Sequence, residues 1–326
     1  MKKKRWIIFA VFMVMLLGTA ARVYATAKQI TAKDLKNLND SSTMAKVSEI
    51  LVKDMEKSKD VNAKEIRSIT ATYGEIDGKD NDNVVIVGNY GSNCALVGVY
   101  QKANGVYVFL DDIGVFFDVE GVNTVNLKNL GRDAVFIKEY AQQIGGAFER
   151  TTFLRGYLWA EDGFKLIYSM AEQVNADWNK YSDNGEDGVE SQWNRVIQTS
   201  KTKLENGNYP AIKAQRNQFY LKSSDTEAKN IPADSTFHEV AKKEVSESYY
   251  WSDKWEKFII CEKVDKTTGE KVAVIEDWGN LPYSIVQDYE IYSSKVRIVR
   301  KDGTTDIVQG ETLSEVRDRK NTIEGV

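Results

Sequence analysis

The stretch GEIDGKDNDNVVIVGNYG, which runs from Gly74 to Gly91, sets a polar turn directly before a run of β-branched residues. Valine and isoleucine favour extended backbone because their branched side chains pack well on a pleated surface. The turn is strongly acidic and contains Glu75, Asp77, Asp80 and Asp82. We therefore predict a strand over NVVIVGNY that is entered from an acidic turn.

Similar β-rich runs surround this stretch and form two series. The first series is EIRSITATY, NVVIVGNY, CALVGVY and GVYVFL, and the second is VNTVNL, DAVFIKEY, AFERTTFLRGYLW and DGFKLIYSM. The last runs of the two series align at Gly105 and Gly163, which are 58 residues apart. Such self-similarity predicts an internal repeat, here of a four-stranded antiparallel unit.

A four-stranded unit with a Gly/Asp turn before its second strand resembles an FG-GAP or VCBS-type repeat. The resemblance covers residues 65–170 and rests on DGKD followed by VVIV and on LGRDAVFI. It implies blades of an integrin-like β-propeller in a secreted protein, with turn acids that hold calcium. The second turn keeps only Asp133 of these acids, and two units are fewer than the blades of a closed propeller, which number about four to eight.

The acidic turn itself has two interpretations. Calcium binds several oxygen ligands, and Glu75, Asp77, Asp80 and Asp82 can provide them. Their spacing differs from the Asp-x-Asp-x-Asp-Gly order of an EF-hand loop. The alternative is a solvated turn whose charges protect the sheet from edge-to-edge association.

The N-terminus has the features of a cleavable secretory signal peptide over residues 1–25. The basic segment MKKKR precedes an apolar run from Ile7 to Leu17, which is short for a membrane span. Val23 and Ala25 occupy the −3 and −1 positions, so we predict cleavage after Ala25. An uncleaved anchor helix is the alternative.

Removal of this segment leaves 39 Lys and Arg against 48 Asp and Glu, a net charge of −9. Nucleic acids and anionic membranes bind cationic surfaces, so we expect neither as a partner. No second long apolar run follows, and we expect no membrane span after signal cleavage. The charge and the leader together predict a secreted, soluble, extracytoplasmic protein.

We predict an α+β fold that is mainly antiparallel β, with peripheral helices and C-terminal hairpins. Residues 26–60 form a helical segment in which Ser42 and Thr43 can cap a helix, and residues 61–175 form the β-domain with two blade-like repeats. Residues 176–326 form a helix plus an antiparallel β-region, on the same core or on a separate one. We expect that helix to start at Asp187, hairpins over 257–276 and 295–308, and a short terminal helix at Thr312.

Two residue groups offer further candidate sites. Cys94 and Cys261 either form a disulfide between the halves of the chain or stay buried as free thiols. Aromatic side chains can stack on sugars or peptides, or they can pack in the core. The candidate stacking residues are Tyr250, Trp251, Trp255 and Trp278.

Evidence for catalysis is sparse. His238 is the only histidine, and no Gly-x-Ser-x-Gly elbow accompanies it. Gly-x-Gly-x-x-Gly and Walker loops are also missing, so we expect no required cofactor, with calcium as the one optional ion. A glycosidase needs only two carboxylates at the right separation, but nothing in the sequence selects such a pair.

These observations favour a non-enzymatic extracytoplasmic binding or interaction module that recognises an extracellular glycan or protein. Two alternatives stay open. One is a secreted, glycosidase-like hydrolase that uses paired carboxylates. The other is an envelope-associated scaffold that docks a partner through its helices.

Thermal melting tests the calcium interpretation. If the acidic turn holds calcium in the folded state, calcium raises the melting temperature and EDTA lowers it, because an ion that binds only the native state stabilises it. A melting temperature that is the same in calcium and in EDTA contradicts a calcium site in the folded protein.

Overall fold

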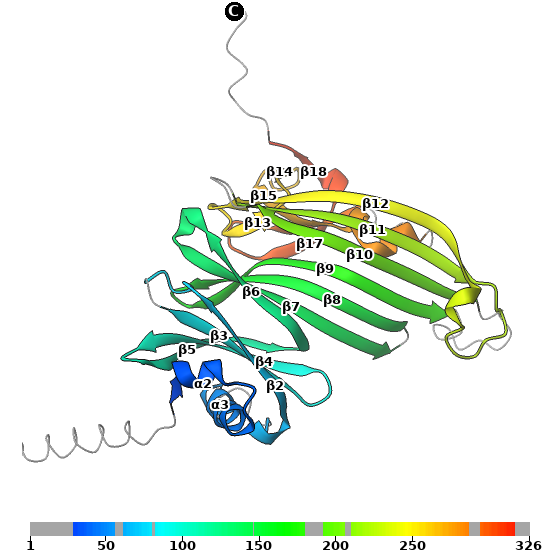
Figure 1. The fold of residues 1–326 in the computed structure, drawn as a ribbon. Coiled ribbons are helices and arrows are strands. Elements are labelled where there is room, and N and C mark those ends of the chain that lie inside the picture. The colour runs from blue at the N-terminus through cyan, green and yellow to red at the C-terminus, as the bar shows by residue number, and fades with distance from the viewer. Residues whose placement is uncertain are drawn as a thin grey trace, which may run out of the picture.

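The computed structural model describes residues 29–55, 61–79, 82–145, 147–179, 192–205, 210–286 and 294–316. Within these residues the protein is mainly antiparallel β, with two α-helices and three antiparallel sheets, one of which is a half-barrel (Figure 1). The described helices include none that is both long and apolar enough to cross a membrane. The predicted signal peptide lies outside the described residues.

The first sheet, sheet A, contains the stretch at Gly74–Gly91. Its strand order is β1-β5-β4-β3-β2, and the predicted strand NVVIVGNY is confirmed as β3. The strands of sheet A are β1 (Ile30–Thr31), β2 (Ile66–Gly74), β3 (Asn83–Tyr90), β4 (Cys94–Ala103) and β5 (Val106–Phe116).

Helices cover one face of sheet A, and the cap predicted at Ser42 and Thr43 lies instead at Asp40. The helices are α2 (Ala32–Lys36) and α3 (Ser41–Asp54), and the Asp40 carboxylate caps α3 by accepting from the Thr43 backbone N–H at 2.9 Å. Leu51 of α3 is fully buried and lies over two glycines of the sheet: a Cβ placed on Gly88 or Gly98 would lie 2.8 or 3.0 Å from its methyl groups. The missing side chains on β3 and β4 therefore let the helix sit close to the sheet.

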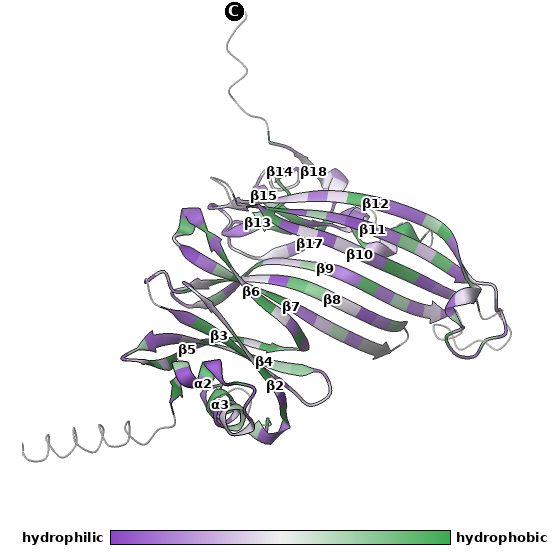
Figure 2. Ribbon diagram, viewed as in Figure 1, coloured by the Kyte–Doolittle hydropathy of each residue, from purple (hydrophilic) through white to green (hydrophobic). Residues whose placement is uncertain are grey.

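The second sheet, sheet B, is an eight-stranded meander in the order β13-β12-β11-β10-β9-β8-β7-β6. Its long strands curve into the half-barrel, and hydrophilic and hydrophobic residues alternate along them (Figure 2). The strands are β6 (Asp118–Leu127), β7 (Arg132–Gly145), β8 (Ala147–Ala160), β9 (Gly163–Asn179), β10 (Trp193–Glu205), β11 (Ala211–Ser223), β12 (Phe237–Ser252) and β13 (Lys257–Ile259).

The third sheet, sheet C, has the order β17-β16-β15-β14-β18. It confirms the two predicted hairpins, β14–β15 and β16–β17, although the segment from Lys257 to Ile259 belongs to sheet B. The strands of sheet C are β14 (Cys261–Asp265), β15 (Lys271–Asp277), β16 (Lys295–Val299), β17 (Thr305–Gln309) and β18 (Leu313–Glu315).

Sheet A packs on the β6–β7 end of sheet B through a shared apolar core. Val85, Val97 and Val99 of sheet A meet Val135 and Ile137 of β7 in this core, and all five side chains are fully buried. The chain passes from one sheet to the other at Phe117, whose backbone N–H donates to the buried Glu139 carboxylate at 2.9 Å. Such corners, where consecutive strands change sheet, are typical of orthogonal sheet packing.

Polar side chains of β3 and β6 also bind backbone groups of the facing sheet. The Asn89 amide accepts from the Val119 N–H and donates to its carbonyl, at 3.0 and 3.1 Å. The Thr124 hydroxyl donates to the Tyr73 carbonyl at 2.7 Å. These bonds satisfy backbone groups that the packing of the two sheets removes from water.

Two predicted helices are wrong. The described part of the segment after Asp187 is strand β10, which pairs with β9 and β11, while residues 187–191 lie outside the described residues. Val196 and Leu204 fit a helical spacing, but long ladders on both sides satisfy the backbone of this segment as a strand. At the C-terminus, Leu313–Glu315 pairs with β14 as β18 and does not form a helix.

The predicted repeat corresponds to two runs of four consecutive antiparallel strands, β2–β5 and β6–β9. The second run continues into β10–β13 within one sheet, and β9 passes through residue 175, where the sequence placed a boundary. The described strands contain no propeller. The turn before β3 and the equivalent turn before β7 lie against each other. The Asp133 carboxylate of the second turn accepts from the Glu75 backbone N–H of the first at 3.0 Å.

Substitution of Gly74 tests the packing between sheets A and B. A Cβ at Gly74 would lie 2.8 Å from both Asp133 Oδ2 and the Thr124 side chain, so we expect Gly74→Ala to lower the unfolding free energy by about 2 kcal/mol. Urea denaturation measures the loss. Gly121→Ala on β6 is the matched control, because a Cβ there has no neighbour within 4 Å. Equal stability of the two variants would contradict this account.

Candidate functional site

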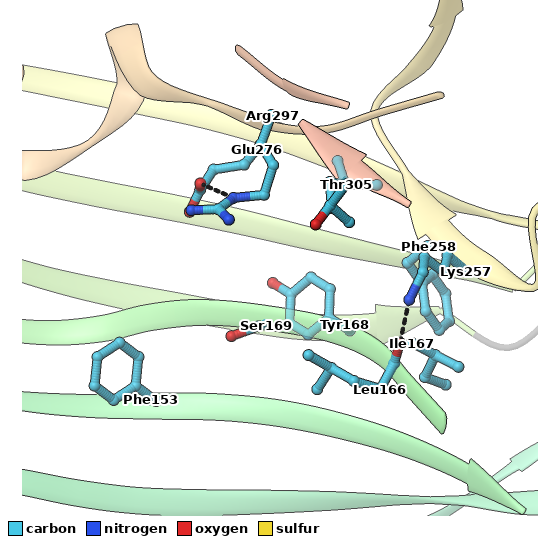
Figure 3. Close-up of a pocket in the computed structure, with 11 residues that line it drawn as sticks. Phe153, Leu166, Ile167, Tyr168, Ser169, Lys257, Phe258, Glu276, Arg297 and Thr305 are labelled. Carbon is cyan, nitrogen blue, oxygen red and sulfur yellow. Dashed lines mark hydrogen bonds and ion pairs between the residues drawn. The ribbon is translucent and has the colours of Figure 1, made fainter. Parts of the chain in front are cut away.

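A pocket of about 390 Å³ lies between sheet B and sheet C (Figure 3). Strands β8, β9 and β13 form one wall, and β15, β16 and β17 form the other. Its lining residues are Phe153, Leu166, Ile167, Tyr168, Ser169, Lys257, Phe258, Ile275, Glu276, Arg297 and Thr305. A pocket of this volume is in the range of small-molecule sites, which is about 300–1,000 Å³.

Apolar side chains make up the body of the pocket. Ile167 and Phe258 are buried in the core of sheet B, whereas Phe153 and Ile275 are half-buried and Leu166 is 41% exposed. Phe258 belongs to the short strand β13, which pairs with the end of β12 opposite Trp251. Because β13 also contacts β9 and β15, it joins the two walls of the pocket.

Glu276 and Arg297 form an ion pair at one end of the pocket. The Arg297 Nε atom donates to Glu276 Oε2 at 3.0 Å, and the Trp278 indole N–H donates to the same oxygen at 2.9 Å. β15 and β16 are neighbours in sheet C, so the pairing of the strands positions these two side chains. The arginine charge is therefore compensated within the site.

Lys257 lies at the other end, beside Leu166. Its ammonium group donates to the Leu166 carbonyl at 2.5 Å. Burial lowers the pKa of Lys257, and the nearby positive charge of Lys165 lowers it further. The ammonium is thus partly desolvated next to an apolar surface.

Tyr168 lines the pocket and is itself buried in the core of sheet B. Its ring packs edge-on against Tyr249 at 5.1 Å between centroids and against Phe258 at 6.2 Å. Its hydroxyl donates to the Met170 sulfur at 3.3 Å, and burial raises the pKa of Tyr168. The phenol therefore stays protonated and acts as a structural wall of the pocket.

The interior of the half-barrel is occupied by the segment after β15. This plug segment consists of two 3-10 turns, Trp278–Asn280 and Pro282–Ile285, and appears in orange behind β10 and β11 in Figure 1. The Asn280 carbonyl accepts from Gln218 at 2.8 Å, and the Tyr283 hydroxyl donates to Glu149 at 2.8 Å. Tyr283 also packs with Trp178 and Tyr220 in a small apolar cluster.

A buried ion pair anchors the plug segment. Arg216 of β11 pairs with Glu247 of β12, and their side chains are 3% and 6% exposed. The Asn280 amide donates to Glu247 at 2.7 Å, and the Tyr249 hydroxyl donates to it at 2.5 Å. Arg216 Nε has no hydrogen-bond partner among the described residues, so the network is only partly satisfied.

The acids of the opening turn lie apart from this pocket. Asp77 is buried and accepts from the Lys79 backbone N–H at 3.2 Å, whereas Asp82 pairs with Lys102 at 2.5 Å. Glu75 is exposed, and Asp80 lies outside the described residues. No group of three potential metal ligands gathers anywhere in the described residues. The calcium site stays a prediction for the complete turn.

The four candidate stacking residues do not share a surface. Trp251 and Trp255 are 8% and 7% exposed and belong to two different core clusters. Tyr250 is 50% exposed, and Trp278 lies half-buried in the plug segment. The aromatic pattern in this part of the chain therefore serves mainly the core.

The cysteines and the histidine also lie outside the pocket. Cys94 begins β4 in sheet A and Cys261 begins β14 in sheet C, and both are free thiols, so this structure lacks the disulfide. His238 is exposed near the start of β12, where it pairs across the ladder with Lys222. Catalytic chemistry that needs a histidine therefore has no support in the pocket lining.

No family model, curated protein or solved structure matches this chain. The shape and lining of the pocket are therefore the evidence for a site, and the sequence did not predict its charged residues. Lys257, Glu276 and Arg297 lie on three strands of two sheets, without a motif or a spacing that links them. Only the approach of β13 and sheet C to β9 brings them together.

Charge removal tests the anchor of the plug segment. We expect Arg216→Met to lower the unfolding free energy by about 3–5 kcal/mol, because it leaves the Glu247 carboxylate buried without its cation. The double variant Arg216→Met/Glu247→Met should recover part of this loss. Urea denaturation measures both. Lys242→Met, which breaks an exposed pair with Glu244 on the same strand as Glu247, is the control and should cost less than about 1 kcal/mol. Additive losses in the double variant would contradict a coupled buried pair.

Proposed function

We propose that this protein is an extracytoplasmic binding protein that takes a small amphipathic ligand in the pocket between sheets B and C. The observation that carries the proposal is the composition of the pocket: five apolar side chains surround a space of about 390 Å³, and a few polar groups stand at its ends. Small-molecule sites commonly combine a mainly apolar lining with a few placed polar groups. The predicted leader and acidic net charge fit an exported binding protein.

The lining gives less support to a hydrolase. A glycosidase uses two carboxylates about 5–10 Å apart, one on each side of the scissile bond. Glu276 is the only carboxylate among the residues that line this pocket, and it is engaged by Arg297 and Trp278. We therefore favour binding without turnover.

The helices give equally little support to a scaffold that docks partners through them. The apolar residues Val47, Ile50 and Leu51 of α3 are buried in the core of sheet A. Their apolar face is already occupied by the chain's own sheet, which leaves mainly charged side chains outward. The pocket between sheets B and C is the better candidate for ligand recognition.

A dye that reports apolar sites tests the proposed function. We expect Nile red, which is neutral, to bind in a saturable way with one equivalent per chain, as measured by fluorescence titration. Ser169 is exposed at the pocket wall on β9, so Ser169→Phe should fill the space and weaken binding by roughly tenfold, about 1.4 kcal/mol. Gln173→Phe, an exposed position on the same strand outside the pocket, is the control. Unsaturable binding, or equal binding by the two variants, would contradict the proposal.

A further inference from the structure

The charges that line the pocket are unbalanced. Lys257 and Arg297 are cationic and Glu276 is anionic, and the ion pair at 3.0 Å compensates Arg297. The remaining positive charge therefore belongs to Lys257. A ligand that enters the pocket meets a neutral ion pair at one end and an excess ammonium at the other.

Lys257 lacks an acidic partner in the described part of the chain. Its ammonium donates to the neutral Leu166 carbonyl, and no described carboxylate forms a salt bridge with it. An ammonium carries three donors, so the contact with one carbonyl leaves donors for a ligand. Burying a charge without a counter-ion is costly, and a bound anion would remove that cost.

The surroundings of Lys257 favour an anion that carries an apolar body. Leu166 adjoins it and is 41% exposed, and the half-buried Phe153 and Ile275 add carbon surface to the lining, whereas the far end holds the neutral Glu276–Arg297 pair and offers no second cation. A monoanion fits this arrangement better than a phosphate dianion, because the single positive charge of Lys257 then balances a single negative charge on the ligand. Lys165 lies near this end, but its ammonium is 3.5 Å from Asp162 and 3.7 Å from Glu256, so its charge is already compensated and Lys257 remains the cation without a described carboxylate partner.

We infer that the pocket selects a carboxylate with an aliphatic or aromatic body, whose carboxylate pairs with Lys257 and whose apolar body lies over Leu166 and the half-buried side chains of Phe153 and Ile275. This inference rests on the proposed function and names the ligand class of the same site. The charge-assisted hydrogen bond is the source of selectivity, since apolar contact alone does not distinguish an acid from the matching alcohol.

Competition against Nile red by octanoate and by 1-octanol tests the inference. The two competitors share their chain and differ mainly in the charged group. We expect octanoate to displace the dye from the wild-type protein at roughly tenfold lower concentration than octanol, because hydrogen bonds to charged groups contribute about 1.5–3 kcal/mol. Lys257→Met should abolish this preference and leave displacement by octanol unchanged.

Two further variants separate a lost charge from a lost fold. Lys257→Gln is also neutral but keeps a donor for the Leu166 carbonyl, and it should lose the preference in the same way. Lys271→Met removes an exposed lysine at the start of β15 and should keep the preference. The melting temperature of each variant shows that it is folded.

The outcomes distinguish the two proposals. If the dye binds in a saturable way but octanoate and octanol displace it equally, the binding site stands and the inferred selectivity for a carboxylate is wrong. A preference that survives in both Lys257 variants would also overturn it. If the dye does not bind the wild-type protein in a saturable way, the proposed function itself, a pocket that binds an amphipathic ligand, is contradicted.

Discussion

Close packing of β2 on β6 at Gly74 is the contact on which the arrangement of sheets A and B depends. Gly74 has room for no side chain, because Thr124 and the Asp133 carboxylate lie against its Cα. That contact places the end of sheet A directly on β6 and β7, and the valines of both sheets then close the core between them. The polar bonds from Asn89 and Thr124 to backbone groups fix the crossing in one position.

The half-barrel follows a different principle from sheet A. Sheet A has apolar residues on both faces and is covered on one side by helices and on the other by sheet B. Sheet B instead has a mixed interior in which Arg216, Glu247 and Gln218 bind the plug segment. Polar side chains in such an interior need hydrogen-bond partners, because a buried polar group without one destabilises the fold. The plug segment, which follows β15, supplies several of these partners. The pocket lies where sheet C approaches β9.

Much of the secondary structure follows from the sequence, and the exceptions have physical reasons. The strand NVVIVGNY, helix α3 and the hairpin over 295–308 were predictable because the local residue pattern is unambiguous there. β10 was not, because its apolar residues at Val196 and Leu204 also fit a helix, and only pairing with β9 and β11 decides. The pocket was not predictable either: Lys257, Glu276 and Arg297 are ordinary surface residue types until two sheets bring them together.

The amino-acid sequence by itself determined that this is a mainly β-protein with amphipathic helices, an acidic balance and sparse catalytic side chains. These properties depend on composition and on local periodicity, which the chain carries in any conformation. Only the tertiary structure decided that the two four-stranded runs belong to different sheets: β2–β5 lie in sheet A, whereas β6–β9 continue into the half-barrel of sheet B. It also decided that the turn at Gly74 is a packing contact and that Lys257 faces an apolar pocket. Both depend on residues far apart in the chain, whose approach is set by the packing of whole sheets.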